Sequence, residues 1–309
     1  MMETKLRGSI APMITVFRED ETIDEQRTRD HVNFLINSGI QGIVVCGSTG
    51  EFFAMSIEER KHMTELVIDE VKQRVPVYVH IGDYRTMSTI ELSTHAARSG
   101  ADGLLILPPY CSCPTTSQVM AHIRAVAERV DLPILLYNNP GVAGIALTPQ
   151  EIKKLQIDGL ISGVKLTGAS LTEVQETIHL CKDTNKIYYG DDRDVLLALF
   201  CGVDGWISGI QNLIPATCRK LTDSALAMNI PLARAIWSAM LPLMRWSTHV
   251  NAEREPHWLS LIKSGLRLLG RDVGRPRRPL SDLDQRMERQ LEVLLRNIES
   301  SVSDTAEHC

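Results

Sequence analysis

The sequence lacks an apolar run long enough to cross a bilayer, a marked excess of charge of either sign, and a regular spacing of cysteines. Without such a run we expect no membrane partner, and the N-terminal residues pass directly into a strand-like stretch rather than a leader. Lys and Arg total 33 against 38 Asp and Glu, and the one basic segment, Arg271 to Arg278, is short. Nucleic acid is therefore not expected as a partner.

The seven cysteines are irregularly spaced along 309 residues and stand mostly inside apolar runs. This pattern indicates reduced thiols rather than a disulfide framework, so we expect a cytoplasmic protein. Hydrophobic residues make up 44% of the chain, enough for one large α/β barrel or for two ordinary domains. No linker that would divide the chain is evident.

Short apolar runs rich in β-branched residues alternate with longer amphipathic stretches, which is typical of repeated βα units and a parallel sheet. Eight strands are predicted, at 9–15, 42–46, 77–81, 103–107, 134–137, 161–166, 187–189 and 205–207. Helices are predicted between them at 24–37, 57–72, 87–98, 117–128, 149–155, 171–181 and 193–200. Capping pairs such as Ser56 with Glu59 and Ser170 with Glu173, and Thr148 before Pro149, mark helix starts.

After the eighth strand only helical patterns remain, at 215–228, 231–249, 256–269 and 280–298. Eight strands with intervening helices close most simply as a barrel. The sequence therefore predicts an α/β fold, a (β/α)8 TIM barrel with a helical C-terminal extension. We expect the barrel to occupy residues 1–211, the extension 212–299, and a polar, frayed tail 300–309.

Lys165 is the one charged residue in the apolar run from Gly159 to Leu166. Burying an ammonium is costly, so we expect a lowered pKa and a neutral amine that can attack a carbonyl carbon and form an imine. The alternative is a structural lysine whose stem packs while its ammonium reaches solvent.

Other chemically active residues fall at the C-terminal ends of the predicted strands, where barrel enzymes place their sites. Gly47-Ser48-Thr49-Gly50-Glu51 offers hydroxyls and backbone N–H groups suited to a carboxylate, although it also fits an ordinary βα turn. Tyr137 is an acid/base candidate if a hydroxyl such as that of Ser48 hydrogen-bonds it. It also fits a tyrosine at the barrel rim with its ring in the core.

Three motifs in this order, Gly47-Ser48-Thr49-Gly50-Glu51, Tyr137-Asn138-Asn139-Pro140 and Gly163-Val164-Lys165, resemble the signatures of the dihydrodipicolinate synthase/N-acetylneuraminate lyase family. The resemblance runs from Gly8 to about Leu283. It implies a Schiff-base-forming (β/α)8 enzyme that acts on pyruvate or another 2-oxo acid without a cofactor or metal. It also implies a homotetramer or homodimer.

Carried over from the resemblance, Lys165 forms the imine, Tyr137 carries protons, and Ser48 and Thr49 bind the substrate carboxylate. Ser48 is also expected to link Tyr137 into a proton relay. Gly190, at the end of the seventh strand, and the main-chain carbonyl of Ile207 are expected to help hold the intermediate.

Departures from the family pattern narrow the expected function. The family's synthases have two adjacent tyrosines where this chain has Tyr110-Cys111, and the second normally reaches into the neighbouring subunit. At the position of Val142, the resemblance implies that the lysine-pathway synthase has an arginine that binds the dicarboxylate. An aliphatic side chain cannot form such a bidentate contact. Dihydrodipicolinate synthesis is therefore disfavoured.

Further pocket positions are specific to this chain. We expect substrate contacts at His80, Asp83 and Cys111. Residues that we expect to hold the distal end of the substrate, or else to serve as helix caps or surface residues, are Asp192, Arg193, Gln211 and Asn212.

The sequence thus favours a lyase that cleaves, dehydrates or deaminates a 2-oxo acid, in the manner of 1-pyrroline-4-hydroxy-2-carboxylate deaminase or 2-keto-3-deoxy sugar acid dehydratases and aldolases. The alternatives are the synthase or the N-acetylneuraminate lyase proper. A metal-dependent aldolase with His80, Asp83 and Asp191 as ligands leaves Lys165 unexplained. A catalytically inactive ligand-binding barrel does not explain a buried amine beside Tyr137 and Ser48.

Overall fold

The computed structural model describes residues 4–111, 114–181, 186–253 and 257–307 of the chain. Eight parallel strands form a closed barrel in chain order, and β1 closes it by pairing with β8, Ile10 opposite Ile207. The predicted (β/α)8 barrel is confirmed. The strands are β1 (Gly8–Pro12), β2 (Gly42–Val45), β3 (Val77–His80), β4 (Gly103–Ile106), β5 (Ile134–Asn138), β6 (Gly163–Leu166), β7 (Lys186–Tyr189) and β8 (Gly205–Ile207).

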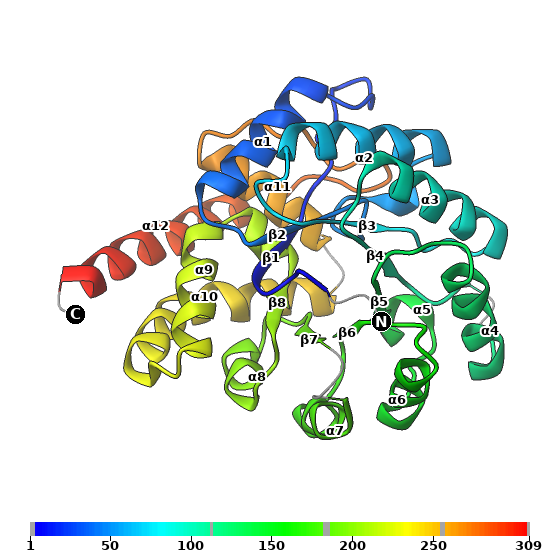
Figure 1. Cartoon of the computed structure of the whole chain (residues 1–309). Coiled ribbons are helices and arrows are strands. Elements are labelled where there is room, and N and C mark those ends of the chain that lie inside the picture. The colour runs from blue at the N-terminus through cyan, green and yellow to red at the C-terminus, as the bar shows by residue number, and fades with distance from the viewer. Residues whose placement is uncertain (1–3, 112–113, 182–185, 254–256, 308–309) are drawn as a thin grey trace.

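Helices surround the strands in a ring, as Figure 1 shows, because each except the single turn α5 presents an apolar face to the outer surface of the barrel. The barrel helices are α1 (Glu25–Asn37), α2 (Ile57–Val71), α3 (Thr86–Ser99), α4 (Thr116–Ala127), α5 (Pro140–Ala143), α6 (Pro149–Ile157), α7 (Leu171–Cys181), α8 (Val195–Cys201) and α9 (Pro215–Leu226). Two 3₁₀ turns, η1 (Phe52–Ala54) and η2 (Gly209–Asn212), follow β2 and β8.

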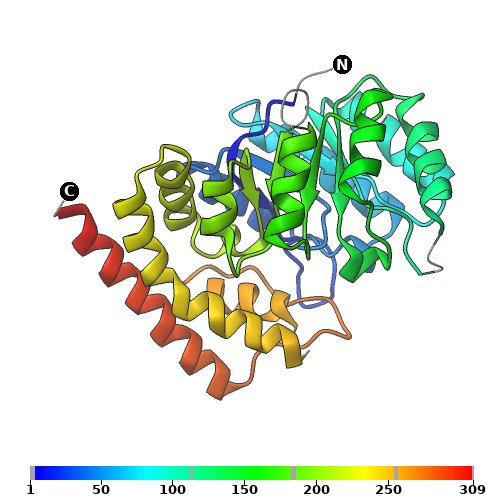
Figure 2. The same ribbon diagram turned by 90° about the horizontal axis from the view of Figure 1, so that it is seen from below.

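Three further helices follow the ring: α10 (Ile230–Glu253), α11 (Trp258–Leu268) and α12 (Gln285–Glu307). Figure 2 shows them together beside one end of the barrel. None of the helices in the described part of the chain is long and apolar enough to cross a membrane.

The boundary between barrel and extension differs from the one expected after residue 211. Helix α9 follows β8 and packs on α8 and β1, so it completes the ring. We therefore propose that the extension begins at Ile230. The frayed tail expected from residue 300 is instead helical as far as Glu307, because neither glycine nor proline interrupts α12; residues 308 and 309 lie outside the described residues.

The inside of the barrel is closed at the N-terminal ends of the strands by aromatic side chains and the N-terminal segment. The rings of Tyr78 and Tyr188 are fully buried, and the hydroxyl of Tyr78 lies 2.6 Å from that of Thr4. Tyr188 donates to the carbonyl of Leu6 at 2.9 Å. Gly103 leaves room for this arrangement, since a Cβ there would lie 2.2 Å from the ring of Tyr78.

Candidate active site

A cavity of about 470 Å³ lies at the C-terminal ends of the strands. Its inner wall comes from strand ends and the loops that follow them, and its outer wall comes from α10 and α11. The lining residues include Pro12, Gly47, Ser48, Thr49, Leu105, Tyr137, Asn139, Val142, Lys165, Thr167, Gly190, Asp191, Asp192, Arg193, Ser208, Ser247, Thr248, Trp258 and Leu261.

Lys165 and Tyr137 face each other across neighbouring strands. They are register partners in β6 and β5, so their side chains project to the same face of the sheet. The amine of Lys165 lies 4.1 Å from the centre of the Tyr137 ring, and each residue is only 6% exposed. Within the described residues this amine has no carboxylate partner at ion-pair distance. The amine is therefore buried, faces the cavity and is not held in an ion pair.

Gly190 makes room for the Lys165 side chain. A Cβ on Gly190 would lie 2.8 Å from Cε of Lys165 and 1.9 Å from the hydroxyl oxygen of Thr167. Its backbone N–H donates to the carbonyl of Leu166 at 2.8 Å, which fixes the end of β7 beside β6. Only glycine fits there without displacing the amine.

The Gly47–Glu51 loop is a tight turn that carries two hydroxyls into the cavity. Its Glu51 N–H donates to the carbonyl of Ser48 at 3.1 Å, and the hydroxyl of Thr15 donates to the carbonyl of Gly50 at 2.7 Å. Thr49 is buried, and the hydroxyl of Ser48 is buried without a hydrogen-bond partner in the described residues. An uncommitted buried hydroxyl costs free energy unless a ligand satisfies it, so this turn suits a bound carboxylate.

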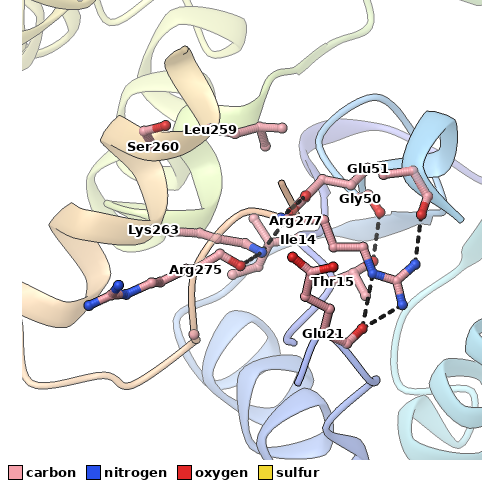
Figure 3. A network of polar contacts seen from close by, with 12 residues as sticks. Ile14, Thr15, Glu21, Gly50, Glu51, Leu259, Ser260, Lys263, Arg275 and Arg277 are labelled. Atoms are coloured by element: carbon pink, nitrogen blue, oxygen red, sulfur yellow. Dashed lines mark hydrogen bonds and ion pairs between the residues drawn. The ribbon is translucent and has the colours of Figure 1, made fainter. Parts of the chain in front are cut away.

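Charged residues of α11 and of the segment after it contact Glu51 at the end of this loop, as Figure 3 shows. Glu51 has the left-handed backbone conformation, φ 60°. Its carboxylate forms an ion pair of 2.6 Å with Lys263 of α11, and both side chains are fully buried. The backbone N–H of Arg277 donates to the second carboxylate oxygen at 2.9 Å, and the ammonium of Lys263 donates to the carbonyl of Arg275 at 3.0 Å. The extension is thereby tied to the cavity loop.

The expected hydrogen bond between Ser48 and Tyr137 is not formed. The hydroxyl of Tyr137 instead accepts a hydrogen bond of 2.8 Å from the side-chain amide of Asn139. The backbone of Asn139, φ −136° and ψ 91°, directs its side chain back toward Tyr137. Sequence reasoning missed this residue, because a side-chain direction after a strand end depends on dihedral angles that the sequence does not show.

The loop after β7 brings two carboxylates to the cavity. Asp191 accepts a 2.7 Å hydrogen bond from the N–H of Gly168, and burial raises its pKa. Burial raises the pKa of Asp192 to about 6, although Ser208, Trp206 and Lys165 act in the opposite direction. The residue is partly exposed, but its Oδ1 atom is covered and has no hydrogen-bond partner among the described residues. Arg193 lines the cavity and is exposed.

Six residues expected at the site do not line the cavity: His80, Asp83, Cys111, Ile207, Gln211 and Asn212. The His80 ring is fully buried against Phe52, with ring centroids 4.5 Å apart, and burial with the nearby Arg60 charge holds its pKa well below the ordinary value. Ile207 is in the barrel interior. Cys111 has φ 78° where the chain turns after β4, and it is exposed on the protein surface.

The polar pair after β8 also has another role. The amide of Asn212 is fully buried and donates to the carbonyl of Pro12, while its oxygen accepts from Ile14 N–H and lies 3.0 Å from the ring of His31. The amide of Gln211 donates to Ser9 and to the carbonyl of Trp206. Both residues join the segment after β8 to β1, and neither lines the cavity.

The residues considered as metal ligands do not come together. Asp83 accepts from Arg85 N–H, Asp191 from Gly168 N–H, and His80 packs on Phe52. Among the described residues no group of three or more His, Cys, Asp or Glu side chains could hold a metal ion.

Comparison with known proteins agrees with this geometry. Residues 5–298 match the model of the dihydrodipicolinate synthetase family. The chain is 35% identical over 291 residues to a 4-hydroxy-tetrahydrodipicolinate synthase from Syntrophus aciditrophicus, an alignment that covers 94% of this chain and 98% of that protein. A prophage protein of the dihydrodipicolinic acid synthase family from E. coli K12, solved in complex with pyruvate, is 30% identical with a TM-score of 0.89 over 96% of this chain and 99% of that one. A putative dihydrodipicolinate synthetase from Pseudomonas aeruginosa has a TM-score of 0.89 at 29% identity, over 95% of this chain and 100% of that one.

Proposed function

Because this chain belongs to the dihydrodipicolinate synthetase family, we propose that Lys165 is the amine through which it forms an imine with a 2-oxo acid. The protein is an enzyme, a lyase of the class I aldolase type. One observation supports the choice of Lys165: its amine is buried, faces the cavity and has no ion-pair partner among the described residues. Attack on the 2-oxo carbon followed by loss of water gives an imine, which then withdraws electrons from C3.

The other roles follow from position around that amine. Tyr137 lies against Lys165 and is the proposed proton carrier for the substrate. Ser48, Thr49 and the N–H groups of their turn are the proposed carboxylate site. Gly190 leaves the space that the Lys165 stem occupies. Asp192 and Arg193 are proposed to contact the distal part of the substrate.

We propose that the substrate is longer than pyruvate and is cleaved, dehydrated or deaminated. The 470 Å³ cavity exceeds the needs of a three-carbon acid, and its outer wall includes Trp258 and Leu261. Val142 lines the cavity at 43% exposure, where it offers no charge to a second carboxylate. The second candidate is 4-hydroxy-tetrahydrodipicolinate synthesis, which the name of the 35% identical relative supports.

Borohydride reduction in the presence of a panel of 2-oxo acids tests the proposal. Reduction of an imine leaves a stable adduct, so intact mass identifies the accepted acid and peptide mapping identifies the lysine. We expect the adduct on Lys165 and none in Lys165→Ala. Lys263 is an internal control, because it is also buried but is paired with Glu51. An adduct that persists in Lys165→Ala would refute the assignment, and product analysis would separate cleavage from 4-hydroxy-tetrahydrodipicolinate synthesis.

Assembly and location are also proposals. We propose a homotetramer or homodimer in the cytoplasm, supported by the exposed side chains of Phe53, at 52%, and Met87, at 71%. Trp237 and Trp246 are partly buried against the protein's own core and are therefore less available for subunit contacts. Light scattering that gave the mass of a monomer would refute the assembly.

A further inference from the structure

The side-chain amide of Asn139 forms one hydrogen bond to the backbone and one to Tyr137, the proposed proton carrier. The residue is 7% exposed and stands at the N-cap of α5, where its Oδ1 accepts from the N–H of Gly141 at 3.1 Å. Its Nδ2 lies 2.8 Å from the hydroxyl oxygen of Tyr137. One rigid group therefore connects the start of a helix to a phenol in the cavity wall.

The direction of the second hydrogen bond follows from the first. The N–H of Gly141 can only donate, so the amide must turn its oxygen toward Gly141 and its NH₂ group toward Tyr137. The phenol oxygen is consequently the acceptor, and its own proton is left for another partner. In the same cavity the hydroxyl of Ser48 is buried and has no partner within the described residues.

We propose that Asn139 is a positioning residue for proton transfer, which fixes the Tyr137 hydroxyl and stabilises its phenolate; this inference rests on the proposed function. With pyruvate as probe, the phenol first loses its proton to solvent, and the phenolate then takes a proton from C3 of the Lys165 imine. The C–H electron pair then forms the C2–C3 double bond of an enamine, and the imine pair moves to nitrogen. Tyr137 returns a proton from solvent to C3 in the reverse step. An N–H aimed at the oxygen that gains the charge favours this transfer.

The neighbouring Asn138 shows what a purely structural asparagine does here. It is buried to a similar degree, at 6% exposure, and both ends of its amide bind the backbone of Leu147 at 2.9 Å. It makes no hydrogen bond to Tyr137 in the described structure. The two residues provide a matched pair, alike in chemistry and burial and different in their contact with the phenol.

Two substitutions separate the bond to the phenol from the helix cap. Serine and aspartate both accept from the Gly141 N–H at an N-cap. Serine is too short to reach Tyr137, so Asn139→Ser removes only the donor. Asn139→Asp replaces the donor by a carboxylate, which opposes ionisation of the phenol. Neither variant should prevent borohydride trapping of pyruvate on Lys165.

The readout is exchange of the C3 protons of pyruvate in D₂O, followed by proton NMR from about pH 6 to pH 10. We expect exchange to fall by about tenfold to a hundredfold in both variants. Its rise with pH should shift to more alkaline pH, further in Asn139→Asp than in Asn139→Ser. Asn138→Ala should unfold at a lower temperature but keep the pH dependence of the parent.

Unchanged exchange in the Asn139 variants, or slower exchange with an unchanged pH dependence, would overturn the inference and leave the proposed function intact. A carboxylate and a hydroxyl group at position 139 would disturb folding for different reasons. Either variant that folds is therefore sufficient to test the inference. A parent protein that is trapped by no 2-oxo acid of the panel would instead refute the proposed function.

Discussion

At the scale of single residues, Gly190 is the most exacting position in the cavity. A Cβ there would collide with the Thr167 hydroxyl and the Lys165 stem, and it would lie 3.1 Å from the immobile carbonyl of Leu166. We expect Gly190→Ala to displace the amine and slow imine formation by about a hundredfold, because small misplacements of reacting groups have effects of that size. Overpacking should also cost about 1–3 kcal/mol of stability. Borohydride quenching at successive times measures the rate of imine formation, and urea unfolding measures the stability.

The double variant Gly190→Ala/Thr167→Ala identifies which neighbour matters. It removes the 1.9 Å contact but not the contact with Lys165. Stability should partly return while trapping stays slow. If trapping returned to the parent rate, displacement of Thr167 and not of Lys165 would be the cause.

At the scale of elements, the sequence predicted the parts whose burial produces a strong pattern. Barrel strands are buried on both faces, so each appears as a short apolar run. The capping pairs of Ser56 with Glu59 and of Ser170 with Glu173 are present as predicted, and a helix starts at Thr148 before Pro149. Helix α5 was missed because a single turn has no amphipathic period. The strand predicted to reach Thr15 ends at Pro12, because the N–H of Ile14 donates to the side chain of Asn212 and no longer to β2.

Part of the candidate site could also be predicted from the sequence, and part could not. Lys165 and Tyr137 could be predicted because a polar residue that ends an apolar strand is unusual and must face the barrel mouth. The cavity walls from α10 and α11 could not, since Ser247 and Trp258 reach the site through long-range packing that has no local pattern. His80 was misassigned because the sequence does not show that Phe52 folds back onto it.

The ion pair between α11 and the cavity loop carries a prediction at this scale. Lys263→Met leaves the Glu51 carboxylate buried without its cation, which should cost about 3–5 kcal/mol and raise the KM for the 2-oxo acid. Glu51→Gln/Lys263→Met should recover much of the stability, because no buried charge remains. Urea unfolding and initial rates measure both effects.

Lys186→Met is the matched control. Its ion pair with Asp204, at 3.1 Å, is partly exposed, and pairs of that kind contribute only about 0–1 kcal/mol. Equal losses in the Lys263 and Lys186 variants would show that the buried pair does not hold the loop.

At the scale of the whole molecule, buried titratable groups determine how stability depends on pH. Burial lowers the pKa of His31 to about 4 and holds that of His80 well below its usual range. As pH falls below about 6.5, these histidines bind protons in the unfolded chain but stay neutral in the folded chain. The free energy of unfolding therefore decreases. Asp192 acts oppositely, because its raised pKa, about 6, adds stability as pH falls from 6 toward 3.8.

The two histidines, together with Glu59 and Glu70, whose pKa values the partners Arg277 and Arg29 lower, outweigh Asp191 and Asp192, so we expect the free energy of unfolding to decrease between pH 7 and about pH 4. His31 alone should account for about 3 kcal/mol over the full window. Its ring is 3% exposed and hydrogen-bonded to Asn212, so His31→Gln can keep that bond without titrating. Urea unfolding across this range should show a shallower slope in His31→Gln and a steeper one in Asp192→Asn. Identical slopes in the parent and His31→Gln would mean that His31 takes up its proton without unfolding, and the acid sensitivity would then have to arise at His80.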